Sequence, residues 1–167
     1  LAFVWGAPDG PRGVIDKPID RHQSARDRMA VREGGREAVT HWQVLERYEA
    51  ETGTRRAKKS TESVASWLAC RLETGRTHQI RVHLASIGHP LLGDETYGAG
   101  FRTKAALLPK PAQEALSALG RQALHSHILV ISHPITDQIL RFRSELPPDL
   151  ARLHDMLAAI RADSSDK

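Results

Sequence analysis

The stretch from Arg71 to Gly98 decides the fold, and it reads Arg-Leu-Glu-Thr-Gly-Arg-Thr-His-Gln-Ile-Arg-Val-His-Leu-Ala-Ser-Ile-Gly-His-Pro-Leu-Leu-Gly-Asp-Glu-Thr-Tyr-Gly. Apolar residues within it recur at positions i, i+4 and i+7, the spacing of one face of an α-helix: Ile80, Leu84 and Ile87. Thr77 can cap the start of such a helix, and Gly88 followed by Pro90 ends it. The sequence therefore predicts a helix over residues 77–87, directly after a strand and a glycine turn.

Polar and cationic side chains crowd the first two turns of this predicted helix: Arg76, His78, Gln79, Arg81 and His83. A helix N-terminus carries free N–H groups and partial positive charge, so it attracts anions. Two arginines in the same place are unfavourable unless a carboxylate or a phosphate lies nearby. The pattern predicts a functional site for an anionic group, and the alternative is a solvated helix start with surface arginines.

Composition limits the class of protein. The chain has 167 residues, of which 40% are hydrophobic and 26% are charged, as is ordinary for one soluble domain. Lys and Arg number 24 against 20 Asp and Glu, so the formal net charge is +4. Arginine supplies 18 of these cations and can bind carboxylate or phosphate with two hydrogen bonds. A polyanionic partner is therefore permitted, although composition alone does not prove one.

Cysteine content and hydropathy exclude further classes. Cys70 is the single cysteine, which excludes an internal disulfide framework and a cysteine-rich zinc site. The sequence has no run of about 18 apolar residues, so it predicts no membrane-spanning helix. It does not open with a basic stretch followed by an apolar one, which is the pattern of a signal peptide. The chain begins with Leu1 rather than Met, in an apolar run typical of a strand already under way, so we expect a natural N-terminal part ahead of it.

Strands and helices are predicted on both sides of the central stretch. The expected strands cover residues 1–5, 39–48, 64–72, 123–132 and 139–142, and further helices cover residues 111–119 and begin at Pro147. Residues 49–60 are expected to form a solvated hairpin tip. We predict an α/β domain of α+β type, with a mixed, largely antiparallel sheet and a few helices, over residues 1–162. Residues 163–167 are predicted to be a tail.

Residues 72–83 closely resemble the third motif of the RluA-type RNA pseudouridine synthases, and residues 89–98 resemble the segment that follows it. The string Arg121-Gln-Ala-Leu-His125 is similar to a later strand of that family. The segments 19–22, 29–31 and 38–41 resemble the approach to the third motif in its members that act on large-subunit ribosomal RNA. This resemblance implies the C-terminal part of a catalytic domain. It also implies an isomerase that converts uridine to pseudouridine in RNA, with large-subunit ribosomal RNA as the expected substrate. Such an enzyme is expected to work in the cytoplasm and to need neither cofactor nor metal.

The resemblance also implies roles for individual residues. Arg81, in the Gln-Ile-Arg triplet, matches the arginine that lies beside the family's catalytic aspartate and keeps it ionised by lowering its pKa. Leu124 matches the apolar residue that the family places against the uracil. Further substrate contacts are expected from four residues of the motif: Arg76, His78, Gln79 and Ile80.

Two of the family's functional residues have no counterpart in the chain. The family's aspartate lies in a His-Arg-Leu-Asp motif, which does not occur, and Arg152-Leu-His-Asp155 has the same letters in another order on a terminal helix. The family's tyrosine would fall ahead of Leu1. We therefore expect the chain to be inactive as a synthase by itself, with Arg81 facing an unfilled charge site.

Two other functions remain open on the sequence. The first is a non-catalytic RNA-binding remnant, consistent with net charges of +3 over residues 1–60 and +4 over residues 101–143. The second is a metal-dependent hydrolase that uses the histidines. His78 and His83 argue against it, because they are five apart rather than at the i, i+4 spacing of a zinc pair. Asp94, in a glycine turn, is interpreted as a turn residue or an arginine partner rather than a catalyst.

Overall fold

A four-stranded antiparallel sheet forms the centre of the molecule, with its strands in the order β1-β6-β5-β2. The computed structural model describes residues 1–25, 27–52 and 60–164. The strands of this sheet are β1 (Ala2–Trp5), β2 (Arg12–Asp16), β5 (Val39–Thr52) and β6 (Ser60–Leu72). β5 and β6 form a long hairpin in which Thr40 lies opposite Leu72, and the register shifts between Val44 and Glu46. The expected strands at residues 39–48 and 64–72 are confirmed, and both are longer than predicted.

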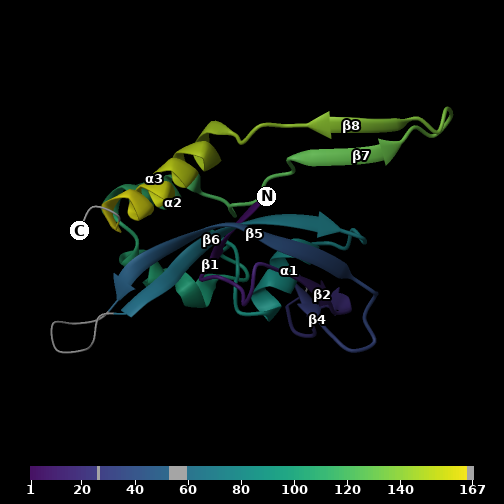
Figure 1. Cartoon of the computed structure of the whole chain (residues 1–167). Helices are drawn as coiled ribbons and strands as arrows, with labels where there is room; N and C mark the ends of the chain where they lie inside the picture. Colours follow the sequence, from purple (N-terminus) through teal and green to yellow (C-terminus); the bar gives the residue numbers. More distant parts are fainter. Residues whose placement is uncertain (26, 53–59, 165–167) are drawn as a thin grey trace.

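Helices cover both faces of this sheet (Figure 1). They are α1 (Gln79–Ser86), the 3-10 segment η1 (Ala99–Leu107), α2 (Lys110–Leu119) and α3 (Pro148–Ser164). Side chains alternate between the two faces along a strand, so Phe3 and Trp5 join the core cluster shared with α2 and α3. Ala2 and Val4 join the cluster shared with α1. The short strand β1 is thus buried on both sides, which explains its uninterrupted apolar sequence.

The last helix follows its predicted pattern. Pro147 precedes α3, and the expected apolar stripe is buried in the core: Leu150, Leu153, Leu157 and Ile160. The helix continues to Ser164, so it includes the first two residues of the predicted tail, and residues 165–167 lie outside the described part.

Two small hairpins flank the central sheet. β3 (Ile19–Arg21) pairs with β4 (Met29–Val31), and β7 (Ile128–Ser132) pairs with β8 (Ile139–Arg143). The β7–β8 hairpin projects beyond the helices (Figure 1), and most of its side chains are exposed.

The strand predicted over residues 123–132 begins only at Ile128. Upstream of it, the chain crosses the edge of β1. There Phe3 N donates to Ala123 O at 3.0 Å and Ala123 N donates to Leu92 O at 2.8 Å. Leu124 forms only an isolated bridge with Ala2, and the next residue, His125, pairs with Leu1, where His125 N donates to Leu1 O at 2.9 Å.

The α+β fold with antiparallel sheets is confirmed. The hairpin tip predicted over residues 49–60 is partly wrong, since residues 49–52 belong to β5 and Ser60 already belongs to β6. Residues 53–59 lie outside the described residues. Within the described ranges, the helices are too short or too polar to cross a bilayer.

Candidate functional site

The start of α1 is fixed by one buried amide, that of Gln79, which is 3% exposed. Its Oε1 accepts hydrogen bonds from Thr74 Oγ1 and Arg76 N, both at 2.9 Å. Its Nε2 donates to Val39 O at 2.9 Å and to Thr40 Oγ1 at 3.1 Å. The side chain therefore ties the turn after β6 to the first residues of β5, and it positions neighbouring groups rather than facing a ligand.

The predicted cap of this helix is wrong. The helix begins at Gln79 rather than Thr77, and its N-cap is His78, whose φ of 57° lies in the left-handed region and whose side chain makes no capping hydrogen bond. The Gln79 side chain accepts a hydrogen bond from the backbone N–H of Arg76 in this turn, so the helix start does not depend on a Thr77 hydroxyl as predicted. The helix ends as expected, with Gly88 at a φ of +84°.

Arg81 and Asp94 form a two-bond ion pair. Arg81 Nε lies 2.7 Å from Asp94 Oδ2, and Nη2 lies 2.9 Å from Oδ1. The Asp94 side chain is fully buried and that of Arg81 is 14% exposed. The expectation that Arg81 faces an unfilled charge is therefore wrong, because a carboxylate 13 positions further along the chain already neutralises it.

Asp94 is held in its ionised form. Burial raises its pKa, but the hydrogen bond from Arg81 and the backbone N–H groups of Tyr97 and Thr96 outweigh burial and leave the pKa below its usual range. The hydrogen bond with Asp94 in turn raises the pKa of Arg81. A buried carboxylate that is this well paired is a poor proton acceptor, which confirms Asp94 as a turn residue and arginine partner.

Tyr97 joins the ion pair to His78. The Arg81 guanidinium carbon lies 4.9 Å from the centre of the Tyr97 ring. The Tyr97 hydroxyl accepts from Met29 N at 2.9 Å and lies within hydrogen-bond distance of His78 Nδ1, at 3.0 Å. Burial and the Arg81 charge lower the pKa of His78. The lowered pKa favours the uncharged form of His78.

His83 is fully buried and shares the Thr40 hydroxyl with the Gln79 amide. Its Nδ1 is 2.9 Å from Thr40 Oγ1 and its Nε2 is 2.9 Å from Lys17 O. Because a carbonyl can only accept, Nε2 donates to Lys17 O and Nδ1 accepts from the Thr40 hydroxyl. Burial lowers the pKa of His83, so this side chain satisfies buried polar groups of the fold and faces no ligand.

The remaining predicted residues lie around this cluster. Arg76 is partly exposed and donates from Nε to Glu37 O at 2.8 Å. Ile80 and Leu124 both pack at the edge of the core cluster under α1, which brings them into one apolar region despite their distance in sequence. The Leu1 amino group donates to His125 O at 2.8 Å, so the first residue lies beside Leu124.

The assembled group can bind and orient an anion but supplies little acid–base chemistry of its own. Its one buried carboxylate is bound to Arg81, and its one accessible histidine is neutral. The sequence gives no local sign of the role of Tyr97, because that role depends on two contacts across the fold; its only signal is its place in the stretch from Arg71 to Gly98. Among residues 1–25, 27–52 and 60–164, no group of three or more His, Cys, Asp or Glu side chains is arranged to hold a metal ion.

Comparison with known families identifies the chain. The family model described as RNA pseudouridylate synthase matches residues 1–86, about half of the sequence. The chain belongs to this family. The resemblance noted for residues 72–83 is thereby confirmed, and the model's match also includes β1 and the β5–β6 hairpin.

Curated relatives agree with this assignment. The chain is 43% identical over 169 residues to "Ribosomal large subunit pseudouridine synthase D" of Xanthomonas campestris pv. campestris, covering 99% of this chain and 44% of the relative. It is 49% identical over 162 residues to the protein of the same name from Nitrosomonas europaea, covering 96% of this chain and 40% of the relative. The chain therefore spans less than half the length of these relatives.

Solved structures show the same fold. "Human RNA Pseudouridylate Synthase Domain Containing 1" matches with a TM-score of 0.59 and 26% identity, over 96% of this chain and 64% of the human one. "Human RNA Pseudouridylate Synthase Domain Containing 4" matches with a TM-score of 0.57 and 23% identity, over 94% of this chain and 60% of the human one. The second match is evidence for the fold alone.

Proposed function

We propose that this chain is part of an enzyme that isomerises uridine to pseudouridine in large-subunit ribosomal RNA. The observation that carries the proposal is the 43–49% identity, over nearly the whole chain, to two relatives named for that activity. The reaction breaks the bond between N1 of uracil and the ribose C1′, turns the base, and forms a bond from C5 to C1′. The C5 proton leaves and N1 gains a proton, so atoms balance without any further reactant.

The catalytic carboxylate of this proposal comes from the part of the relatives that the chain does not span. Arg81 supports that carboxylate. A guanidinium has five N–H donors, and Asp94 accepts hydrogen bonds from Nε and Nη2. The remaining donors allow Arg81 to bridge to a second carboxylate, which would lower its pKa and keep it ionised. Asp94 thus acts as a positioning residue for Arg81.

Substrate contacts are assigned to the surface around Arg81. Leu124 and Ile80 offer an apolar surface for the uracil ring, and Arg76 and His78 offer donors to phosphate or base oxygens. Gln79 contributes indirectly, since its amide holds the backbone of Arg76. No redox or metal chemistry is assigned to the reaction, and action on ribosomal RNA is the reason to propose a cytoplasmic location.

The substrate class can be tested with a fused protein. The unspanned part of the Nitrosomonas europaea relative would be joined ahead of Leu1, and the product incubated with transcripts of large-subunit ribosomal RNA and, separately, of transfer RNA. Carbodiimide modification followed by primer extension detects pseudouridine. We expect new stops on the ribosomal transcript alone. Stops on the transfer RNA alone would contradict the assigned substrate. A folded fusion that binds ribosomal RNA without modifying it would favour the non-catalytic RNA-binding remnant.

A further inference from the structure

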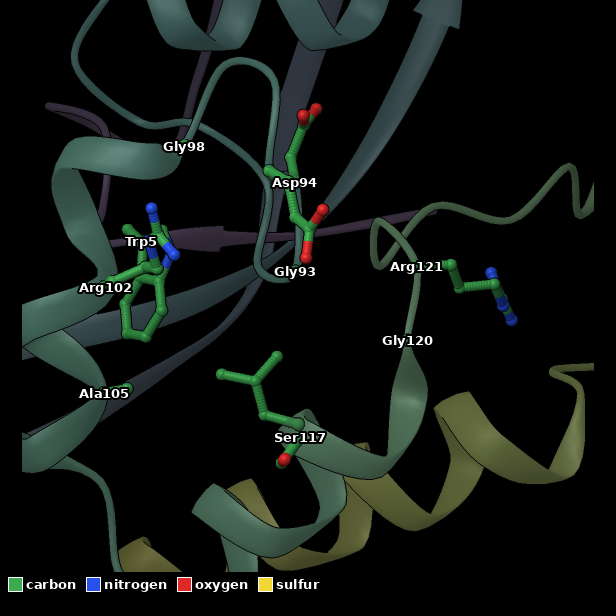
Figure 2. A pocket seen from close by; sticks show the side chains of 11 residues that line it. Trp5, Gly93, Asp94, Gly98, Arg102, Ala105, Ser117, Gly120 and Arg121 are labelled. Atoms are coloured by element: carbon green, nitrogen blue, oxygen red, sulfur yellow. The ribbon is translucent and has the colours of Figure 1, made fainter.

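A hollow of about 370 Å³ lies on the side of the molecule formed by η1 and α2, outside the Arg81 group. Figure 2 shows the loop from Gly93 to Gly98 along one edge, η1 with Arg102 and Ala105 along a second, and α2 with Ser117 along a third. Arg76, His78, Gln79 and Arg81 are not among its lining residues. Asp94, the partner of Arg81, does line it, so the hollow adjoins that cluster through this one residue.

The backbone around this hollow is tightly fixed. Gly93 has a φ of +72°, and a Cβ there would lie 2.3 Å from Arg121 O, so only glycine allows the loop to approach the segment after α2 so closely. A Cβ at Gly98 would lie 2.7 Å from Asp94 O. The same loop carries the carboxylate that holds Arg81. The hollow is preformed and its wall continues into the Arg81 group.

The lining combines apolar side chains with charged groups of both signs: the carboxylates of Asp94 and Glu95 and the guanidinium groups of Arg102 and Arg121. Trp5, which is 3% exposed, lines the hollow together with Ala105 and Leu116. Arg102 is exposed at the rim beside Trp5 (Figure 2), and η1 carries Lys104 as well but no acidic residue. Arg121 also lines the hollow, but its guanidinium is bound to Asp149 at 2.8 Å. Arg102 is thus the cation that the rim offers to a ligand.

We propose that this hollow binds one unpaired nucleotide of the RNA, outside the position where uridine is isomerised. A base has a flat apolar face that fits against Ala105 and Leu116, to which the 3% of Trp5 that is exposed adds little, and arginine guanidinium planes also stack on bases. Its 5′ phosphate reaches Arg102 at the rim. Glu95, also in the lining, accepts a hydrogen bond from an imino or amino group of the base. This assignment rests on the proposed function, because it takes RNA as the partner.

Paired substitutions separate this site from general attraction to RNA. Ser117 and Ala118 are both exposed on α2, but only Ser117 lines the hollow. Arg102 and Arg141 are both exposed arginines, but only Arg102 lines it. Ser117→Trp and Arg102→Ala are therefore the test variants, and Ala118→Trp and Arg141→Ala are their matched controls. Thermal unfolding establishes that all four fold like the parent chain.

The measurement is fluorescence anisotropy of a labelled single-stranded uridine oligonucleotide with the full 167-residue chain. Base stacking contributes about 1–3 kcal/mol per base, so each test variant should weaken binding at least about fivefold and each control by less than about twofold. Equal losses for a test variant and its control would overturn the proposal. So would a chain that binds no RNA. If the fused protein forms pseudouridine but test and control variants lose the same RNA affinity, the hollow is not a nucleotide site and the proposed enzyme function still stands.

Amide and indole chemical shifts distinguish bound RNA from a free nucleotide. In an assigned spectrum of the chain, the oligonucleotide should shift the Trp5 indole and Gly98 amide signals, and Ser117→Trp should abolish those shifts while Ala118→Trp keeps them. Uridine monophosphate should shift the same signals only at far higher concentration. Shifts from the free nucleotide without any from the oligonucleotide would mean a site for free nucleotides and would contradict the proposal.

Discussion

Arg81, on the second turn of α1, and Asp94, in the loop after it, are joined by two hydrogen bonds of 2.7 and 2.9 Å with the carboxylate fully buried. This contact makes the helix and the loop one rigid unit. It also fixes the direction of the arginine that the proposed reaction needs.

Asp94→Ala should destabilise the chain by about 3–5 kcal/mol, because removing one partner leaves a mostly buried guanidinium without its counter-charge. Chemical denaturation measures the loss. Arg32→Ala is the matched control, since Arg32 and Asp20 form a half-exposed pair at 3.9 Å whose loss should change stability by less than about 1 kcal/mol. Equal effects of the two substitutions would mean that the Arg81–Asp94 pair contributes no more than a surface contact.

The same pair should make stability fall in acid. The folded pKa of Asp94 lies below its usual value of 3.8, so the unfolded chain binds the proton more readily. Its contribution is fully present above about pH 4 and is lost as the pH falls through the lowered folded pKa. Asp94→Asn should remove this part of the pH dependence, measured by denaturation at a series of acidic pH values. An unchanged acid slope in Asp94→Asn would contradict the assignment.

His83 should make stability depend on pH in a second range, less acidic than that of Asp94. Its folded pKa is lowered from 6.5 by burial, so protonation is easier in the unfolded chain and stability rises with pH. The contribution is complete above pH 6.5 and falls as the pH drops from there toward the lowered pKa. His83→Gln should flatten the stability curve between about pH 7 and pH 5, whereas His22→Gln, at an exposed position, should leave its slope unchanged.

RNA binding should weaken steeply with salt. The net charges of +3 over residues 1–60 and +4 over residues 101–143 predict phosphate contacts that release counterions. With about three such contacts to a single strand, affinity should fall roughly 20-fold between about 50 mM and about 200 mM salt. Fluorescence titration at these two concentrations measures it. Affinity that does not change with salt would argue against a phosphate-contacting surface.

Local patterns predicted those parts of the molecule that depend on neighbouring residues. The stripe from Leu150 to Ile160 and the end of α1 at Gly88 needed only helical spacing and glycine conformation. The start of α1 was misplaced because Gln79, through bonds to Val39 and Thr40, replaced a local cap. A contact across some forty positions leaves no local signature.

In the candidate site, too, neighbouring residues indicated some features and contacts between distant residues decided the others. The stretch from Arg76 to Arg81 drew attention by its charge, and Asp94 was assigned as a turn or arginine partner from its glycine neighbour. The specific pairing with Arg81, and the place of Tyr97 between Arg81 and His78, depend on how the loop folds back over α1. The strand predicted from residue 123 begins later, at Ile128. The apolar pattern already starts upstream, but there the chain forms its hydrogen bonds with β1 and with the loop at Leu92.

Tritium release from RNA labelled at C5 of uridine tests the central claim most directly, because that hydrogen leaves only when the base is rejoined through carbon. The chain fused to the unspanned part of the Nitrosomonas europaea relative should release tritium, and the 167-residue chain alone should release none. In the fusion, Arg81→Ala should lower turnover by about 100-fold or more, the equivalent of about 3 kcal/mol, and Arg76→Ala by much less. A folded fusion without tritium release, or release by the chain alone, would contradict the account.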